Sequence, residues 1–206
     1  TVDDGLPSNE VRAVCIDQRG HVWAATDRGV ARFDGQSTLT IRRSDGLPVD
    51  QIISLLEDRQ GRMWFGTDGG GICRCEGEEL KVLGVAEGLC HGQVNAMMED
   101  RAGHLWLATP AGVSRFDGLQ WRDFSSRDAY ALGGGKVTSL LATRDGVIWA
   151  GTTTGLSRFI DGEWTAVSTS EVPSVRGLLQ TSDGSVWVAA FDGSGLHFVR
   201  YRDGLW

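Results

Sequence analysis

The sequence is poor in several features that would place it in a common class of protein. It has four Pro, two Tyr and four His among 206 residues. No window approaches the roughly 18 uncharged apolar residues of a membrane span. The first residues, TVDDGLPSNE, lack the basic region and apolar run of a signal peptide. No stretch keeps a 3.6-residue apolar period, so we expect neither long helices nor membrane insertion of this segment.

Positive charge is also scarce. The net charge is -7 and the pI is near 5.1, whereas a protein that binds phosphate backbones needs an excess of Lys and Arg. We therefore expect no nucleic-acid partner. Apolar residues make up 41% and charged residues 23% of the chain, which is typical of a globular protein rather than a disordered one.

Glycine and tryptophan are abundant and regularly spaced. The chain has 29 Gly and 8 Trp. Five Trp follow the same pattern, Gly-x-x-Trp, about every 42 residues along the whole chain: Trp23, Trp64, Trp106, Trp149 and Trp187. A repeat that covers the whole sequence argues against two unrelated domains. We expect these five Trp to have a structural role, buried between neighbouring repeats.

Each repeat holds short apolar runs rich in Val, Ile, Trp and Phe, separated by D-x-x-G and D-G turns. Four short antiparallel strands in some 40 residues form one blade of a β-propeller. We therefore predict an all-β fold: a single β-propeller domain over 1–206 with five four-stranded antiparallel blades. The predicted blades are 5–44, 45–86, 87–127, 128–169 and 170–206, and the last lacks most of its outer strand.

Several repeated positions are typical of blade construction. The residue two after each Trp is Gly or Ala, which lets neighbouring sheets approach closely. An Asp or Thr precedes the first hairpin and is expected to cap it through side-chain to backbone hydrogen bonds; this position holds Asp17, Asp58, Asp100, Thr143 and Thr181. A repeated Arg is expected to stack on aromatics or pair with an acid; it is Arg32, Arg74, Arg115 and Arg158.

The segments D-G-L-P-S-N, D-x-x-G-x-x-W-x-(A/G)-T and G-(V/L/I)-x-R-F resemble the two-component regulator propeller repeat. In that family such repeats form the periplasmic sensor region of hybrid two-component histidine kinases. The resemblance covers all five repeats and is loosest in the fifth. It implies a non-catalytic, ligand-sensing or protein-docking propeller in signal transduction, outside the cytoplasm. The motif residues build blades and carry no ligand chemistry of their own.

The four cysteines do not follow a standard metal motif. Cys15 and Cys75 stand where other repeats have Leu, Met or Phe, and Cys73 stands where they have Ala or Ser, which indicates packing. A zinc site or a disulfide, with Cys90 included, is the alternative. We predict no metal and no cofactor. Four free thiols suit a reducing compartment, so a cytoplasmic location stays the alternative to the periplasmic or extracellular one.

Histidine offers little support for catalysis. His21 and His104 share a variable turn position and are expected to be solvated. Propeller lyases that resemble this repeat place a His and carboxylates at the centre of the ring. Here no two His can be paired with a nearby acid from the sequence. We therefore predict that the chain is not an enzyme, with a propeller lyase as the least favoured alternative.

The residues that vary between repeats indicate where a ligand binds. The loops that enter each blade and those between its second and third strands should share one face. Polar side chains there are candidate ligand-binding residues: Asn9, Arg12, Gln51, His91, Gln93, Asn95, Lys136 and Arg176. They suit a small polar ligand, a glycan or a protein partner. A lectin-like carbohydrate-binding propeller is the alternative function, and an ordinary solvated loop is the alternative interpretation.

The two ends of the chain are compatible with either a closed ring or an open arc of blades. Trp206 would begin the outermost strand of the last blade, and Thr1 and Val2 would form the end of such a strand. In a closed five-blade ring, Thr1 and Val2 would pair beside the third strand of the last blade. In an open arc, a second copy or a longer parent chain would complete the ring, so self-association is the alternative.

Overall fold

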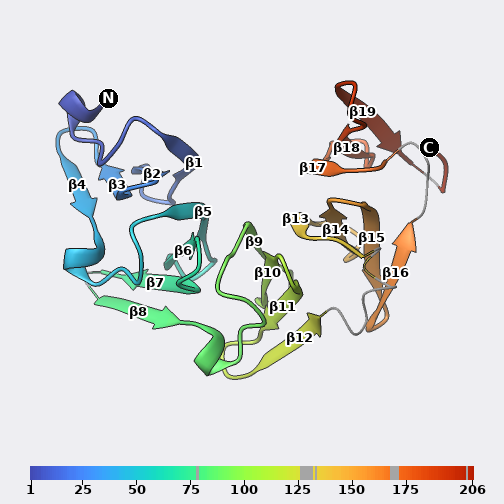
Figure 1. Cartoon of the computed structure of the whole chain (residues 1–206), viewed down its shortest axis with the longest axis horizontal. Helices are drawn as coiled ribbons and strands as arrows, with labels where there is room; N and C mark the ends of the chain where they lie inside the picture. Colours follow the sequence, from blue (N-terminus) through green and yellow to red (C-terminus); the bar gives the residue numbers. More distant parts are fainter. Residues whose placement is uncertain (78, 126–131, 133, 168–171, 203) are drawn as a thin grey trace. The chain divides into compact units, whose positions relative to one another are not determined.

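The computed structural model describes residues 1–77, 79–125, 132, 134–167, 172–202 and 204–206. Within them the fold is all-β, with four antiparallel sheets of four strands and one of three, as the repeat predicts (Figure 1). The described residues form no helix long and apolar enough to cross a membrane. The chain divides into two compact units, Thr1–Met97 and Met98–Trp206, which we describe one at a time. Whether 1–206 is a single domain stays a prediction.

The first unit holds two complete blades (Figure 1). In each, the strands pair with their neighbours in chain order, so the first and fourth strands lie at opposite edges of the sheet. The first blade consists of β1 (Val11–Ile16), β2 (Val22–Thr26), β3 (Gly29–Phe33) and β4 (Thr38–Ile41). The second consists of β5 (Ile52–Glu57), β6 (Met63–Thr67), β7 (Ile72–Glu76) and β8 (Glu79–Leu83).

The second unit holds the remaining blades, the first of which begins at the boundary. The third blade consists of β9 (Ala96–Glu99), β10 (Leu105–Thr109), β11 (Gly112–Phe116) and β12 (Trp121–Ser125). The fourth consists of β13 (Val137–Ala142), β14 (Ile148–Thr152), β15 (Gly155–Ile160) and β16 (Glu163–Val167). The fifth has β17 (Val175–Gln180), β18 (Val186–Phe191) and β19 (Leu196–Tyr201), and no outer strand among the described residues.

Neighbouring blades pack through the repeated Trp and the small residues beside it. Within the first unit, the buried Trp23 ring lies 5.7 Å from the ring of Phe65 in the next blade. Within the second unit, a Cβ added at Gly151 would collide with the side chain of Val175 on β17. A larger residue at Gly151 would therefore force the two sheets apart, which confirms the packing role predicted for this position.

The repeated Asp caps its hairpin and also holds the Trp of its own blade. Asp58 Oδ1 accepts hydrogen bonds from the Gln60 and Arg62 backbone N–H groups, both at 3.0 Å. Its Oδ2 accepts from Trp64 Nε1 at 2.8 Å. The first and third blades repeat all three bonds. The capping role is confirmed, whereas the Asp–Trp bond, six residues along the chain, was not predicted.

The histidines beside these Asp residues correct one expectation. His21 and His104 are partly buried rather than solvated, because each ring Nδ1 lies near the second oxygen of its Asp, at 2.9 Å from Asp17 and 3.0 Å from Asp100. Arg62 makes the same contact with Asp58 in the second blade. The position varies in sequence because several donors can reach this carboxylate, not because it is unused.

Two further expectations differ from the structure. Thr1 and Val2 form no strand: Val2–Asp4 is a 3-10 turn (η1) that ends at Gly5 in the left-handed conformation, and the same turn precedes the second and third blades. Trp187 is exposed, unlike the Trp of the other four blades. The repeated Arg does stack on aromatics where Arg32 lies over Trp23 and Arg115 over Trp106, each 5.7 Å from the ring centroid.

Candidate functional site

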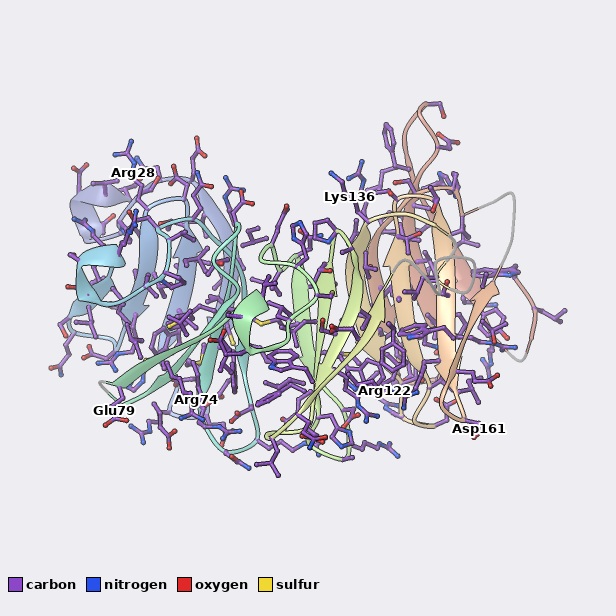
Figure 2. All side chains as sticks on the ribbon, turned by 60° about the horizontal axis from the view of Figure 1, so that its bottom comes forward. Arg28, Arg74, Glu79, Arg122, Lys136 and Asp161 are labelled. Atoms are coloured by element: carbon purple, nitrogen blue, oxygen red, sulfur yellow. The ribbon has the colours of Figure 1, made fainter. Side chains whose placement is uncertain are left out.

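In each sheet, the loop that enters the blade and the turn between the second and third strands lie at the same end of the strands. The pairing shows this directly, since Val11 at the start of β1 is opposite Thr26 at the end of β2, and Thr26 is opposite Gly29 at the start of β3. In the first unit, Arg28 lies at this end and Glu79 at the opposite one (Figure 2). We call this end of the strands the loop edge. It corresponds to the loop-bearing face predicted from the sequence.

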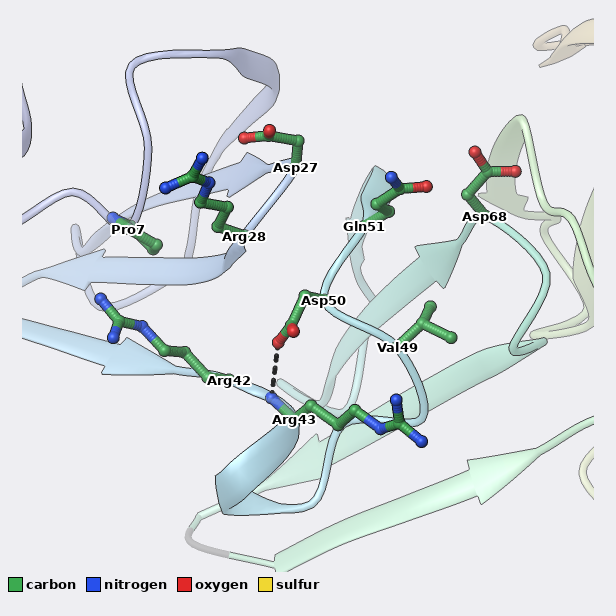
Figure 3. Close-up of a pocket in the computed structure, with 9 residues that line it drawn as sticks. All are labelled: Pro7, Asp27, Arg28, Arg42, Arg43, Val49, Asp50, Gln51 and Asp68. Carbon is green, nitrogen blue, oxygen red and sulfur yellow. Dashed lines mark hydrogen bonds between the residues drawn. The ribbon is translucent and has the colours of Figure 1, made fainter.

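A pocket of about 640 Å³ opens at the loop edge of the first unit. Loops of the first and second blades line it, and most of the lining side chains are polar (Figure 3). Three are basic and three acidic, and the full lining is Pro7, Asp27, Arg28, Arg42, Arg43, Val49, Asp50, Gln51 and Asp68. Such a mixture of donors and acceptors over a concave surface suits a small polar ligand better than an apolar one.

Within the pocket the arginines point in different directions. Arg28 and Arg42 both extend toward Pro7, whereas Arg43 extends toward the side of Val49 (Figure 3). The backbone N–H of Arg43 donates to Asp50 Oδ1 at 2.8 Å, which fixes the loop between β4 and β5. Neither Arg28 nor Arg42 makes an ion pair or a side-chain hydrogen bond with any residue that the structure describes. Their guanidinium groups are therefore available to a ligand.

One acidic group at the pocket is incompletely bonded. Asp27 Oδ1 is buried and has no hydrogen-bond partner among the described residues. Asp68, by contrast, is exposed, and its backbone N–H donates to the carbonyl of Gln51 at 3.0 Å. This bond holds the turn after β6 against the loop that enters the second blade. The pocket therefore combines fixed loop backbones with free side chains.

Of the predicted ligand-binding residues, only Gln51 lines this pocket. Asn9 lies nearby in sequence but serves the loop: its Oδ1 accepts from the Val2 backbone N–H at 2.9 Å. In the next repeat, the Arg43 backbone N–H donates to Asp50 in the same way, again across seven residues. The position of Asn9 therefore helps to build the turn that precedes each blade. Arg12 is exposed on β1 and does not line the pocket.

His91, Gln93 and Asn95, three of the predicted ligand-binding residues, form hydrogen bonds with one another. His91 Nδ1 accepts from the Gln93 backbone N–H at 2.9 Å, and Gln93 Nε2 donates to Asn95 Oδ1 at 3.0 Å. Gln93 also forms an isolated bridge with Asp68. This cluster holds the loop that enters the third blade, and its polar atoms are largely committed to that role.

Lys136 and Arg176 belong to the loop edge of the second unit. Lys136 is exposed, and its backbone pairs with Thr153 through two hydrogen bonds, one to the Thr153 hydroxyl (Figure 2). The Arg176 guanidinium lies 5.8 Å from the ring centroid of Phe191. Neither lines the pocket of the first unit. Both stay candidates for ligand contact.

The cysteines lie in packing environments. Cys73 and Cys75 are buried in the core of the first unit, and no disulfide joins any of the four cysteines. Burial raises the pKa of Cys73 to about 12 and raises the pKa values of Cys75 and Cys15 as well. These thiols stay protonated near neutral pH and are poor nucleophiles and metal ligands. Among the described residues, no three His, Cys, Asp or Glu side chains form a group that could hold a metal ion.

Sequence reasoning missed the arginines and Asp27 of the pocket. The available signal was departure from the repeat. Arg28 immediately precedes the first glycine of β3, where the third blade has Ala111 and the fourth has Thr154. Arg42 directly follows Ile41, which pairs with Val30. At the same position, after Leu83, the second blade has Gly84. The blade therefore does not require arginine at either position.

Comparison with known proteins decides the family. Four segments of the chain, 5–28, 46–69, 88–111 and 131–154, match the family model described as two component regulator propeller. The chain belongs to the two-component regulator propeller repeat family. No curated protein shows significant sequence similarity to it. The fifth repeat, whose resemblance is loosest, lies outside the matched segments of this two-component regulator propeller.

Solved structures with the same fold include two extracellular domains of putative hybrid two-component systems from B. thetaiotaomicron. One has 19% identity and a TM-score of 0.85 and covers 98% of this chain, and the other has 18% identity, a TM-score of 0.77 and 97% coverage. The present chain spans about 30% of each of those chains. At these identities the likeness establishes the propeller fold and not the ligand.

An enzyme also shares the fold of the two-component regulator propeller. A catalytically inactive virginiamycin B lyase from Staphylococcus aureus, solved with quinupristin, has 15% identity and a TM-score of 0.77. The match covers 97% of this chain and 70% of the lyase. The fold alone therefore does not separate sensing from catalysis, and the side chains at the loop edge have to do so.

Proposed function

We propose that this two-component regulator propeller is a non-catalytic ligand-binding part of an extracytoplasmic sensor region, and that it binds a small polar ligand at the loop edge of its first unit. The observation that carries the proposal is the polar pocket of about 640 Å³. Two of its side chains, Arg28 and Arg42, stand at positions where other blades have different residues. A sensor needs such a site, because a ligand can alter signalling only by binding one state of the protein better than another.

Three histidines have structural roles that support a non-catalytic function. His21 and His104 contact the Asp residues that hold the blade Trp, and His91 accepts a backbone hydrogen bond within its own loop. Removal of any of them would disturb a turn. A general acid or base must lie within hydrogen-bond reach of the bound substrate. None of the three lines the pocket.

The test is the thermal unfolding of the intact chain with a panel of monosaccharides, sugar acids, amino acids and short oligosaccharides. A ligand at a hundred times its Kd stabilises the folded chain by about 2.7 kcal/mol and raises the melting temperature. We expect Asp68→Ala, at the pocket, to reduce this rise, and Arg176→Ala, in the second unit, to leave it unchanged. Stabilisation that survives Asp68→Ala and is lost in Arg176→Ala would move the site to the second unit.

A panel in which no compound raises the melting temperature would contradict ligand sensing by this chain. Turnover of any compound by the chain would contradict the non-catalytic part of the proposal. Stabilisation by neutral oligosaccharides, with no response to charged monomers, would favour the lectin-like alternative.

A further inference from the structure

Two arginines from different loops of the first blade lie on one side of the pocket, and neither forms an ion pair with an acidic residue that the structure describes. Arg28 lies in the turn between β2 and β3, and Arg42 follows β4 directly. Both extend toward Pro7 (Figure 3), and neither makes an ion pair with a described residue. Two like charges in one concavity repel each other, and an anion between them removes this cost.

Gly29 brings these two arginines together. Its φ of 121° lies in the left-handed region, and a Cβ at this position would lie 3.3 Å from Cγ of Arg42 and would collide with the carbonyl oxygen of Ile41. The absence of a side chain at Gly29 thus lets the Arg42 stem pass directly over the turn that carries Arg28. The backbone fixes the starting points of both side chains.

The acidic residues around the pocket restrict the kind of anion. Asp27, Asp50 and Asp68 line the same space, and the whole chain has a net charge of -7. Repulsion from these carboxylates is about twice as large for a dianion as for a monoanion. The same carboxylates accept hydrogen bonds from ligand hydroxyl groups. A planar carboxylate also matches the guanidinium fork in a bidentate arrangement.

We propose that Arg28 and Arg42 form a carboxylate subsite of this pocket, and that the ligand is a small hydroxylated monocarboxylate, the chemistry of a sugar acid. The inference rests on the proposed function and specifies its ligand. Arg28 and Arg42 hold the carboxylate, and the neighbouring acidic and amide side chains receive the hydroxyl groups. Arg43, which extends to the other side of the pocket, is outside this subsite.

The repeat itself supplies variants that the blade tolerates. Ala111 stands at the position of Arg28 in the third blade, and Gly84 stands at the position of Arg42 in the second. Arg42 has φ -128° and ψ 177°, an extended backbone that Ala also adopts. Arg28→Ala and Arg42→Ala are therefore expected to fold, and circular dichroism and thermal unfolding would confirm this.

The experiment is isothermal titration calorimetry of the intact chain with four probes: glucuronate, glucose, acetate and inorganic phosphate. Glucose has the hydroxyl groups without the charge, acetate has the charge without the hydroxyl groups, and phosphate at neutral pH carries more charge. We expect glucuronate to bind at least tenfold more tightly than the other three. Arg28→Ala and Arg42→Ala should each weaken glucuronate binding about tenfold or more. Arg12→Ala, which removes the same charge outside the pocket, should leave it unchanged.

The outcomes separate this inference from the proposed function. Equal binding of glucose and glucuronate, or tighter binding of phosphate, would overturn the monocarboxylate subsite. Glucuronate binding that Arg12→Ala weakens as much as Arg28→Ala would show a general charge effect and would also overturn it. If none of the four probes binds while another polar compound stabilises the chain and Asp68→Ala abolishes the effect, the subsite is wrong and the proposed function stands. If no compound binds in either experiment, both fail.

Discussion

Trp149 and Trp187 occupy the same position in consecutive blades but lie in different environments. Each pairs with the equivalent Leu of its first strand, Leu141 or Leu179, and with the equivalent Arg of its third. Trp149 is 3% exposed and Trp187 is 36% exposed. Tyr201, from the next blade, lies 5.1 Å from Trp149, ring to ring. The difference shows that the following blade, and not the Trp's own sheet, completes its burial.

The rest of the fifth blade's face confirms this. Leu179 is 61% exposed and Phe198 is 65% exposed. Together with Trp187 they line an apolar depression of about 480 Å³. In the first blade the opposite kind of face is open: Val22 is exposed, whereas Met63, Ile148 and Val186 at the same position are buried. One face of each blade therefore covers the Trp of the preceding blade. The other face carries the blade's own Trp, which the following blade covers.

The largest effect is expected where the Trp is fully enclosed. Trp106 is buried, its ring lies 5.1 Å from Phe159 of the next blade, and its Nε1 donates to Asp100 Oδ2 at 2.7 Å. Trp106→Ala should lower the free energy of unfolding by about 3–5 kcal/mol, because it leaves a cavity between blades and removes one of the hydrogen bonds to Asp100 Oδ2. Urea denaturation at neutral pH measures this loss.

Trp106→Phe is the control for that variant. It keeps the aromatic packing and loses the hydrogen bond, so it should cost clearly less than Trp106→Ala. A Trp106→Ala variant that unfolds within about 1 kcal/mol of the parent would show that contact with the next blade does not stabilise the fold, and the comparison with Trp187 would lose its basis.

Much of the fold could be predicted from the sequence because the repeat supplies its own alignment. The period of the Trp and the turn glycines fixed the blades, the antiparallel pairing and the incomplete last sheet. Exposure of Trp187 could not be read from its own repeat, since burial depends on the neighbouring blade. The pocket was harder still. Arg28 and Arg42 lie 14 positions apart, and only the closeness of β3 and β4 at Gly29 brings them to one side of the pocket.

The second effect concerns the Asp that fixes the Trp, which only the first three blades have. Burial raises the pKa of Asp58, but hydrogen bonds from Trp64 and Arg62 outweigh it and hold the pKa below its ordinary value. A carboxyl group with a lowered pKa stabilises the fold above its unfolded pKa, about 4, and this contribution is lost as the pH falls through the folded value. Asp100 behaves in the same way.

Asp58→Thr tests this, because Thr143 and Thr181 stand at the same position in the last two blades. The variant should be about 1–3 kcal/mol less stable than the parent at pH 7, since it leaves Trp64 Nε1 without its acceptor. The difference should shrink as the pH falls below about 4, because the unfolded chain then binds a proton at Asp58 that the folded chain, with its lowered pKa, binds only at lower pH. Urea denaturation from pH 7 to pH 3 measures both. A difference that stays constant over this range would show that the Asp58 charge contributes nothing.

The smallest effect is expected at Trp187, which has a Thr in place of the Asp and is not covered by a further blade among the residues that the structure describes. Trp187→Ala should lower the free energy of unfolding by about 1 kcal/mol, because removal of a side chain that is already 36% exposed leaves no enclosed cavity. The measurement is urea denaturation of dilute protein beside Trp106→Ala, followed by circular dichroism so that the loss of one Trp does not alter the signal. A cost above about 3 kcal/mol would mean that this face is covered in solution. Sedimentation would then show whether a second copy covers it, since a species near 45 kDa, about twice the 22.3 kDa chain, should dissociate in the Trp187→Ala variant.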